Sequence, residues 1–198
     1  MEWLRHTSIL PILFIFHLSL FSFLLSSCQS NSFQIRGYTK QLPEGDTICL
    51  VADSQPEKVL ATAMVNNGQF HLTGETDSVF LCRIYARSQR DNGLTLFLEP
   101  GNITVELNIS PNLRRVSGTR INNEWQHLTD SIQLLGTRLA SLSEISTLSS
   151  NGFQHDNYKT IDSLHHKMSD CILNTAHRNR DNPLGQYLMD KYKEPEFR

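Results

Sequence analysis

The sequence predicts an α+β protein, in which an N-terminal antiparallel β-sandwich or barrel-like domain is followed by a helical hairpin and a short C-terminal helix. Two observations support this fold class. Up to about Ser117, short hydrophobic stretches are interrupted by turn-forming residues every eight to twelve residues, as is typical of a β-sandwich or barrel. After Gly118, hydrophobic residues recur at spacings of three and four, which is the period of an amphipathic helix.

A hydrophobic segment near the N-terminus ends at a cysteine. It extends without charge from about Ile9 to Leu25 after a short basic stretch, which is the layout of a secretory signal peptide. The segment ends in Leu-Ser-Ser-Cys28, which resembles the bacterial lipobox, whose cysteine becomes the lipid-bearing N-terminus. We therefore predict a signal peptide over 1–27, acylation of Cys28 and a tether over 28–32. An ordinary signal peptide with an incidental cysteine is the alternative.

The predicted anchor also indicates a location. Two or three acyl chains hold a protein stably on a membrane, so we expect a lipid-anchored protein of the bacterial cell envelope. The residues after Cys28 carry no acidic cluster, which favours the periplasm-facing side of the outer membrane. The formal net charge of -2 is too close to neutral to indicate a nucleic acid as partner.

The β-domain is predicted over 33–117, and two of its turns have specific chemistry. Asn67-Gly68 can take positive φ at both central positions of a tight hairpin turn. In Glu99-Pro100-Gly101-Asn102, the Pro-Gly pair is typical of a type II turn. Each turn predicts an antiparallel pair of flanking strands, 59–65 with 69–73 and 94–98 with 103–108. The expected strands are Phe33–Tyr38, Thr47–Ala52, Val59–Val65, Gln69–Thr73, Val79–Ala86, Leu94–Leu98, Ile103–Asn108 and Leu113–Val116.

The region over 118–192 is predicted to be helical, with a tail over 193–198. Asn123 with Gln126 resembles a capping box at the start of the first helix. Asn182-Pro183 predicts the cap and first residue of a short last helix over 183–192. Two apolar stripes predict two longer helices that pack as an antiparallel hairpin. The stripes are Trp125, Leu128, Ile132, Leu135, Leu139 and Leu142, and Tyr158, Ile161, His165, Met168 and Ile172.

Three cysteines follow Cys28, and their spacing excludes the common cysteine motifs. Cys49, Cys82 and Cys171 form no Cys-x-x-Cys pair, so the usual redox motif and zinc knuckle are both missing. Cys82 lies on the apolar face of its predicted strand. We expect buried thiols, and a disulfide between Cys49 and Cys82 is the alternative because both fall in predicted strands.

No catalytic or metal-binding motif is recognisable in the sequence. There is no nucleophile elbow, phosphate-binding glycine loop or dinucleotide fingerprint. None of the histidines after the signal peptide has the spacing of a metal ligand set. His166 shares a helix face with Asp162 and Asp170, a pattern typical of a solvated, charge-paired surface. We therefore expect no enzyme activity, no cofactor and no metal.

Three segments resemble one known family: GQFHLTGETD, LFLEPGNITVEL and SGTRINNEW. The family is the domain of unknown function (DUF 4369) found at the N-terminus of Bacteroidetes-type lipoproteins. In that family, a β-rich domain leads through helices into a thioredoxin-like thiol–disulfide oxidoreductase domain. The resemblance covers about 33–190 and is most specific at Phe97–Asn102. The family's catalytic cysteines have no counterpart here, so we expect the thioredoxin domain to be absent.

Together these features predict a lipid-anchored, non-catalytic accessory or binding module. Its expected partners are the membrane, through the lipid, and another envelope protein or a small ligand. One alternative is a redox partner that uses the isolated Cys49, Cys82 or Cys171. The other is a truncated remnant of a thioredoxin-like lipoprotein.

Overall fold

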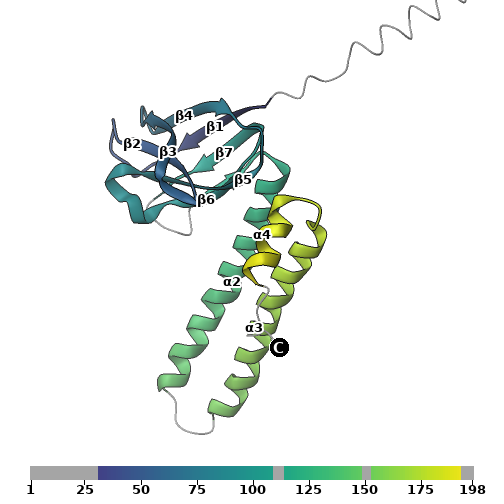
Figure 1. The fold of residues 1–198 in the computed structure, drawn as a ribbon. Coiled ribbons are helices and arrows are strands. Elements are labelled where there is room, and N and C mark those ends of the chain that lie inside the picture. The colour runs from purple at the N-terminus through teal and green to yellow at the C-terminus, as the bar shows by residue number, and fades with distance from the viewer. Residues whose placement is uncertain (1–30, 109–113, 149–152, 193–198) are drawn as a thin grey trace, which may run out of the picture. The chain divides into compact units, whose positions relative to one another are not determined.

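Two four-stranded sheets and three α-helices make up the computed structural model, which describes residues 31–108, 114–148 and 153–192. Figure 1 shows the sheets N-terminal to the helices, which confirms the predicted α+β class. The strands are β1 Ser32–Tyr38, β2 Thr47–Ala52, β3 Gln55–Met64, β4 Gln69–Glu75, β5 Phe80–Ala86, β6 Leu94–Leu98, β7 Gly101–Glu106 and β8 Arg115–Ser117. The helices are the 3-10 helix η1 Arg87–Asn92 and the α-helices α2 Arg120–Leu148, α3 Phe153–Arg178 and α4 Pro183–Lys191.

The sandwich consists of two separate sheets, so it is not a closed barrel. One sheet has the strand order β4-β1-β7-β8, and the other has the order β3-β2-β5-β6. Among the described strands, β1 and β7 pair in parallel, with Phe33 opposite Gly101, whereas the other pairs are antiparallel. The expectation of a purely antiparallel domain is therefore wrong at this pair. The chain enters β7 at the same end of the sandwich at which β1 begins, so β1 and β7 run in the same direction.

The two predicted hairpin pairs are also wrong, although the chain turns at Asn67-Gly68 and bends at Pro100. β3 pairs with β2 and β4 pairs with β1, so the Asn67-Gly68 turn joins strands of different sheets. Between β3 and β4 the turn is closed by the single bridge from Asn66 to Gln69. In the same way, β6 pairs with β5 and β7 pairs with β1. A tight turn fixes a local reversal of the chain, but it does not keep the next strand in the same sheet.

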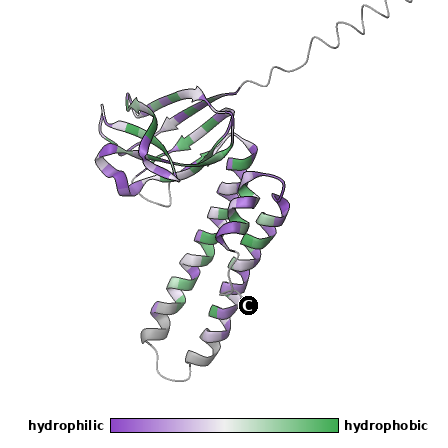
Figure 2. Ribbon diagram, viewed as in Figure 1, coloured by the Kyte–Doolittle hydropathy of each residue, from purple (hydrophilic) through white to green (hydrophobic). Residues whose placement is uncertain are grey.

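The main core lies between the inner faces of the two sheets. Buried and more exposed residues alternate along β1, β4 and β7, as the period of two requires, and Figure 2 shows hydrophobic and hydrophilic residues alternating in the sandwich. Ile35, Leu50, Ile84 and Leu96 are fully buried in this core. A second buried cluster joins β6 to the helices, and it contains Phe97, Ile121, Leu128, Ile172, Ala176, Leu184 and Leu188.

The predicted helices are present, with one boundary shifted. α2 starts at Arg120, three residues before the predicted cap Asn123. The side chains of Gln126 and Asn123 do not form a capping box but accept from the amides of Val116 in β8 and of Gly118 just after it. In α4 the prediction is confirmed: Asn182 accepts hydrogen bonds from the Leu184 and Gly185 amides, and Pro183 follows the cap. Of the predicted second stripe, Ile172 is buried, whereas Tyr158 and His165 are exposed. In the described part of the chain, no helix has the length and hydrophobicity needed to cross a bilayer.

Candidate functional site

Helix α2 closes one side of the sandwich by binding the edge of β6. The side chain of Asn122 is fully buried. Its Oδ1 accepts from the Phe97 amide at 2.9 Å, and its Nδ2 donates to the Phe97 carbonyl at 2.8 Å. The indole Nε1 of Trp125 donates to the Thr95 carbonyl at 3.0 Å. These side chains take the place of a neighbouring strand, so β6 cannot extend its sheet here.

The edge of β8 is closed by the same helix. Gln126 Oε1 accepts from the Val116 amide at 2.7 Å, and Asn123 Oδ1 accepts from the Gly118 amide at 3.0 Å. An ion pair of 2.6 Å between Arg115 and Asp130 lies beside them. The two sheet edges on this side are therefore both occupied by polar side chains of α2.

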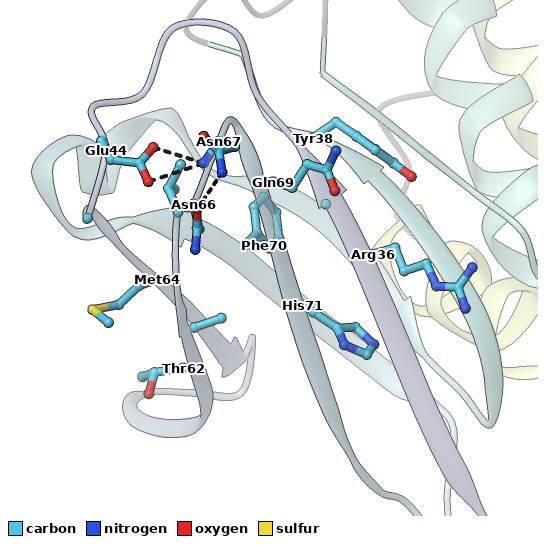
Figure 3. Close-up of a pocket in the computed structure, with 14 residues that line it drawn as sticks. Arg36, Tyr38, Glu44, Thr62, Met64, Asn66, Asn67, Gln69, Phe70 and His71 are labelled. Carbon is cyan, nitrogen blue, oxygen red and sulfur yellow. Dashed lines mark hydrogen bonds between the residues drawn. The ribbon is translucent and has the colours of Figure 1, made fainter.

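The opposite side of the sandwich is open. Strands β3 and β4 are the outer strands of their sheets, and within the described residues neither has a strand partner on its outer edge. A groove of about 1080 Å³ lies between them. Figure 3 shows Thr62 and Met64 projecting from β3, Arg36 and His71 from the other sheet, and Phe70 between them. Met64 is 69% exposed and Tyr38 is 46% exposed, so the groove presents apolar as well as polar groups.

A rigid turn forms one end of this groove. Asn67 and Gly68 have φ of 50° and 69°, the positive values that the sequence predicts for them. Both carboxylate oxygens of Glu44 accept from the Asn67 amide, at 3.1 and 2.9 Å (Figure 3). The Thr39 amide donates to the Gly68 carbonyl at 2.8 Å. Because these contacts satisfy the backbone of the turn, the end of the groove is preformed.

The exposed edge of β3 has two chemically different halves. Its first half contains Pro56, Glu57 and Lys58, the residue types that commonly protect an edge strand from pairing with another chain. Its second half, Val59–Met64, has no charged residue, and the last three of these residues line the groove. The unprotected half of the edge therefore leads into the groove.

Comparison with known families identifies the sandwich. Residues 33–125 match the family model described as a domain of unknown function (DUF4369). This part of the chain is a DUF4369 domain. The match begins in β1 and ends at Trp125, so it includes the residues of α2 that close the β6 edge. No curated protein matches the chain.

The DUF4369 domain separates the predicted motif residues into two places. Asn67 and Gly68 lie at the groove. Glu99, Pro100, Gly101 and Asn102 lie around the β6–β7 corner, at the other end of β1, where Gly101 is opposite Phe33 and has the predicted positive φ, 123°. Glu99 Oε1 contacts Asn122 Nδ2 at 3.4 Å, which indicates a structural role. Cys28, the predicted lipid attachment site, lies outside the described residues.

The sequence analysis missed most residues of the groove. Arg36 and His71 are directly opposite each other in the β1–β4 register, and Glu44 comes from the loop before β2. They meet through tertiary pairing, which no local spacing reveals. The usable sequence signal was the charge-free stretch Val59–Met64 in a predicted strand.

The cysteines of the DUF4369 domain are free thiols, so the disulfide considered between Cys49 and Cys82 is not formed. In the β2–β5 register, Cys49 is opposite Tyr85 and Cys82 is opposite Ala52. The two cysteines are thus an odd number of positions apart and point to opposite faces of the sheet. Cys82 lies in the main core, whereas Cys49 packs with Val51 and Tyr85.

We expect Cys82 to be unreactive in the folded protein. Burial, and to a smaller extent the negative charge of Asp53, raises the pKa of the Cys82 thiol to about 12. Alkylation requires the thiolate, which is scarce at neutral pH when the pKa is this high. Iodoacetamide at pH 7.5 should label the half-buried Cys171 long before Cys82, and urea should remove the difference. Labelling of Cys82 at the same rate as Cys171 in the native chain would contradict this expectation.

No group of three or more His, Cys, Asp or Glu side chains in the described residues is arranged to hold a metal ion. His166 and Asp162, which the sequence places on one helix face, are in contact at 3.7 Å, and both side chains are exposed. The backbone carbonyl and the carboxylate of Asp162 raise the pKa of the His166 imidazole. This is a surface pair on one helix face.

Proposed function

We propose that this chain is a lipid-anchored, non-catalytic accessory module of the cell envelope whose DUF4369 domain binds an extended segment of another envelope protein along β3. The observation that carries the proposal is the open side of the sandwich, where an uncharged strand edge borders a preformed groove. A DUF4369 domain in a predicted lipoprotein is compatible with such a role.

An extended peptide fits this groove better than a small molecule. A strand edge offers a row of backbone N–H and C=O groups, and a peptide in β conformation satisfies all of them while alternate side chains enter pockets. One face of an added strand would lie over the small inward residues Ala61 and Ala63 and the ring of Phe70. Its other face would lie beside the exposed Thr62 and Met64. The partner segment should therefore be uncharged and have apolar residues at alternate positions.

Anchoring would come from acylated Cys28, and the periplasmic face of the outer membrane remains the expected location. The intact mass of the protein extracted from its native membrane tests this part of the proposal. We expect cleavage before Cys28 and added acyl chains. A mass that retains 1–27, or that lacks lipid, would contradict it.

The groove is tested by replacing Met64 with lysine in the full chain. Charged residues, lysine especially, protect exposed strand edges from pairing with another strand, so this substitution should block binding. Capture of the partner from detergent-solubilised native membranes should fall at least about tenfold, which corresponds to about 1.4 kcal/mol of binding free energy.

The matched control is Leu134→Lys, because Leu134 is a similarly exposed apolar residue, at 73%, on helix α2. It should capture the same protein as the parent chain does. Equal capture by the parent chain and both variants would show that the interaction does not use the groove.

A further inference from the structure

We infer that the sandwich contacts the lipid headgroups with the end formed by the β4–β5 turn, and that its groove faces away from the membrane. This inference rests on the proposed lipid attachment at Cys28. The inference specifies which surface of the domain touches the membrane. It also specifies the direction from which a partner must approach the groove.

The first described residue is fixed to the β4–β5 turn. The Thr76 amide donates to the Asn31 carbonyl at 2.8 Å, and Asn31 Nδ2 donates to Asp77 Oδ1 at 2.7 Å. β1 begins at the next residue, with Ser32 opposite Glu75. The chain is thus held by the fold from Asn31 onwards.

Covalent geometry limits the distance from Cys28 to this fixed point. Gln29 and Ser30 separate Cys28 from Asn31, and a chain spans at most about 3.6 Å per residue. Whatever conformation these residues adopt, the α-carbons of Cys28 and Asn31 are therefore no more than about 11 Å apart. An acylated Cys28 lies at the membrane interface, so the turn at Thr76–Ser78 must lie within or just above the headgroup layer.

The groove lies at the other end of β1. It is lined by Arg36, Gly37 and Tyr38 at the end of that strand, and by Gln69 at the start of β4. At about 3.3 Å per residue, the six steps from Ser32 to Tyr38 span about 20 Å. A bilayer excludes the folded domain from its interior, so the end near Asn31 meets the lipid and the groove end projects away from it.

Two exposed carboxylates beside the tether limit how deeply this end enters the headgroup layer. Glu75 and Asp77 are exposed beside Asn31, and anionic headgroups repel carboxylates. The repulsion decays over a Debye length of about 8 Å at physiological salt, which is comparable to the reach of the tether. It resists insertion of this end into the interface without freeing the anchored chain.

Site-specific quenching tests the orientation. In the lipidated full chain with Cys171→Ser, a fluorophore is attached to Ser78→Cys or to Gln69→Cys, and the protein is bound to phosphatidylcholine vesicles that contain nitroxide-headgroup lipid. Cys49 and Cys82 are buried and should not interfere. We expect quenching at position 78 to be at least about threefold stronger than at position 69, because the two sites lie at opposite ends of the sandwich.

A longer tether provides the control. Insertion of about 12 Gly and Ser residues between Ser30 and Asn31 should reduce quenching at position 78 towards that at position 69, because a flexible linker lets the domain leave the surface. Equal quenching at both positions in vesicle-bound protein overturns the orientation alone. Failure of the mature chain to bind vesicles overturns the lipid anchor, and the orientation with it.

Discussion

Asn122→Ala is expected to lower the free energy of unfolding by about 3 kcal/mol, because it leaves the amide and the carbonyl of Phe97 without partners in a buried position. Asn122 is fully buried and makes both of these hydrogen bonds. Urea denaturation of the mature chain, followed by circular dichroism, measures the change.

Asn123→Ala is the matched control, since it makes the same chemical change one residue along the same helix. Asn123 is exposed and accepts from the Gly118 amide, which water can satisfy after the substitution. We expect a loss of no more than about 1 kcal/mol. Equal effects of the two substitutions would mean that α2 does not depend on Asn122 to dock on β6.

Phe97→Ala should destabilise the protein by about 4 kcal/mol, the usual cost of removing a buried aromatic ring and leaving a cavity. Phe97 is 1% exposed. Its ring makes edge contacts with Trp125 and Tyr187, at centroid distances of 5.9 and 6.1 Å, so it joins β6 to α2 and α4. Thermal or urea unfolding of the variant measures the loss.

Tyr158→Ala serves as the control for removal of an aromatic ring, because Tyr158 is 70% exposed. Its effect should stay within about 0.5 kcal/mol, as for most surface substitutions. A loss below about 1 kcal/mol for Phe97→Ala would show that the helices are not packed on β6 as described.

Local sequence patterns predicted the elements of this fold better than their pairing. Strands Thr47–Ala52 and Leu94–Leu98 have the predicted bounds, because alternation and turn residues act over a few positions. The sheet that each strand joins was predicted wrongly after Asn67-Gly68 and after Pro100-Gly101. That choice depends on contacts between distant strands, such as the parallel pairing of Phe33 with Gly101, which no local period encodes.

The candidate site was predictable in the same limited way. Turn chemistry identified Asn67 and Gly68, which do form the end of the groove. It could not show that Glu44 binds the Asn67 amide, since the two residues are brought together only by folding. The misplaced helix start has a related cause. Asn123 and Gln126 have the spacing of a capping box, yet their side chains bind the amides of Gly118 and of Val116 in β8, which would otherwise lack these partners.

Hydrogen exchange of the β3 amides, with and without the captured partner, tests the central proposal most directly. A strand added to the open edge converts outward-pointing amides into hydrogen-bonded ones, and exchange slows when such bonds form. We predict that the amides within Val59–Met64 exchange more slowly when the partner is present. In the Met64→Lys variant, adding the partner should leave the exchange of these amides unchanged. Unchanged exchange along β3 in a saturated complex would contradict binding by strand addition.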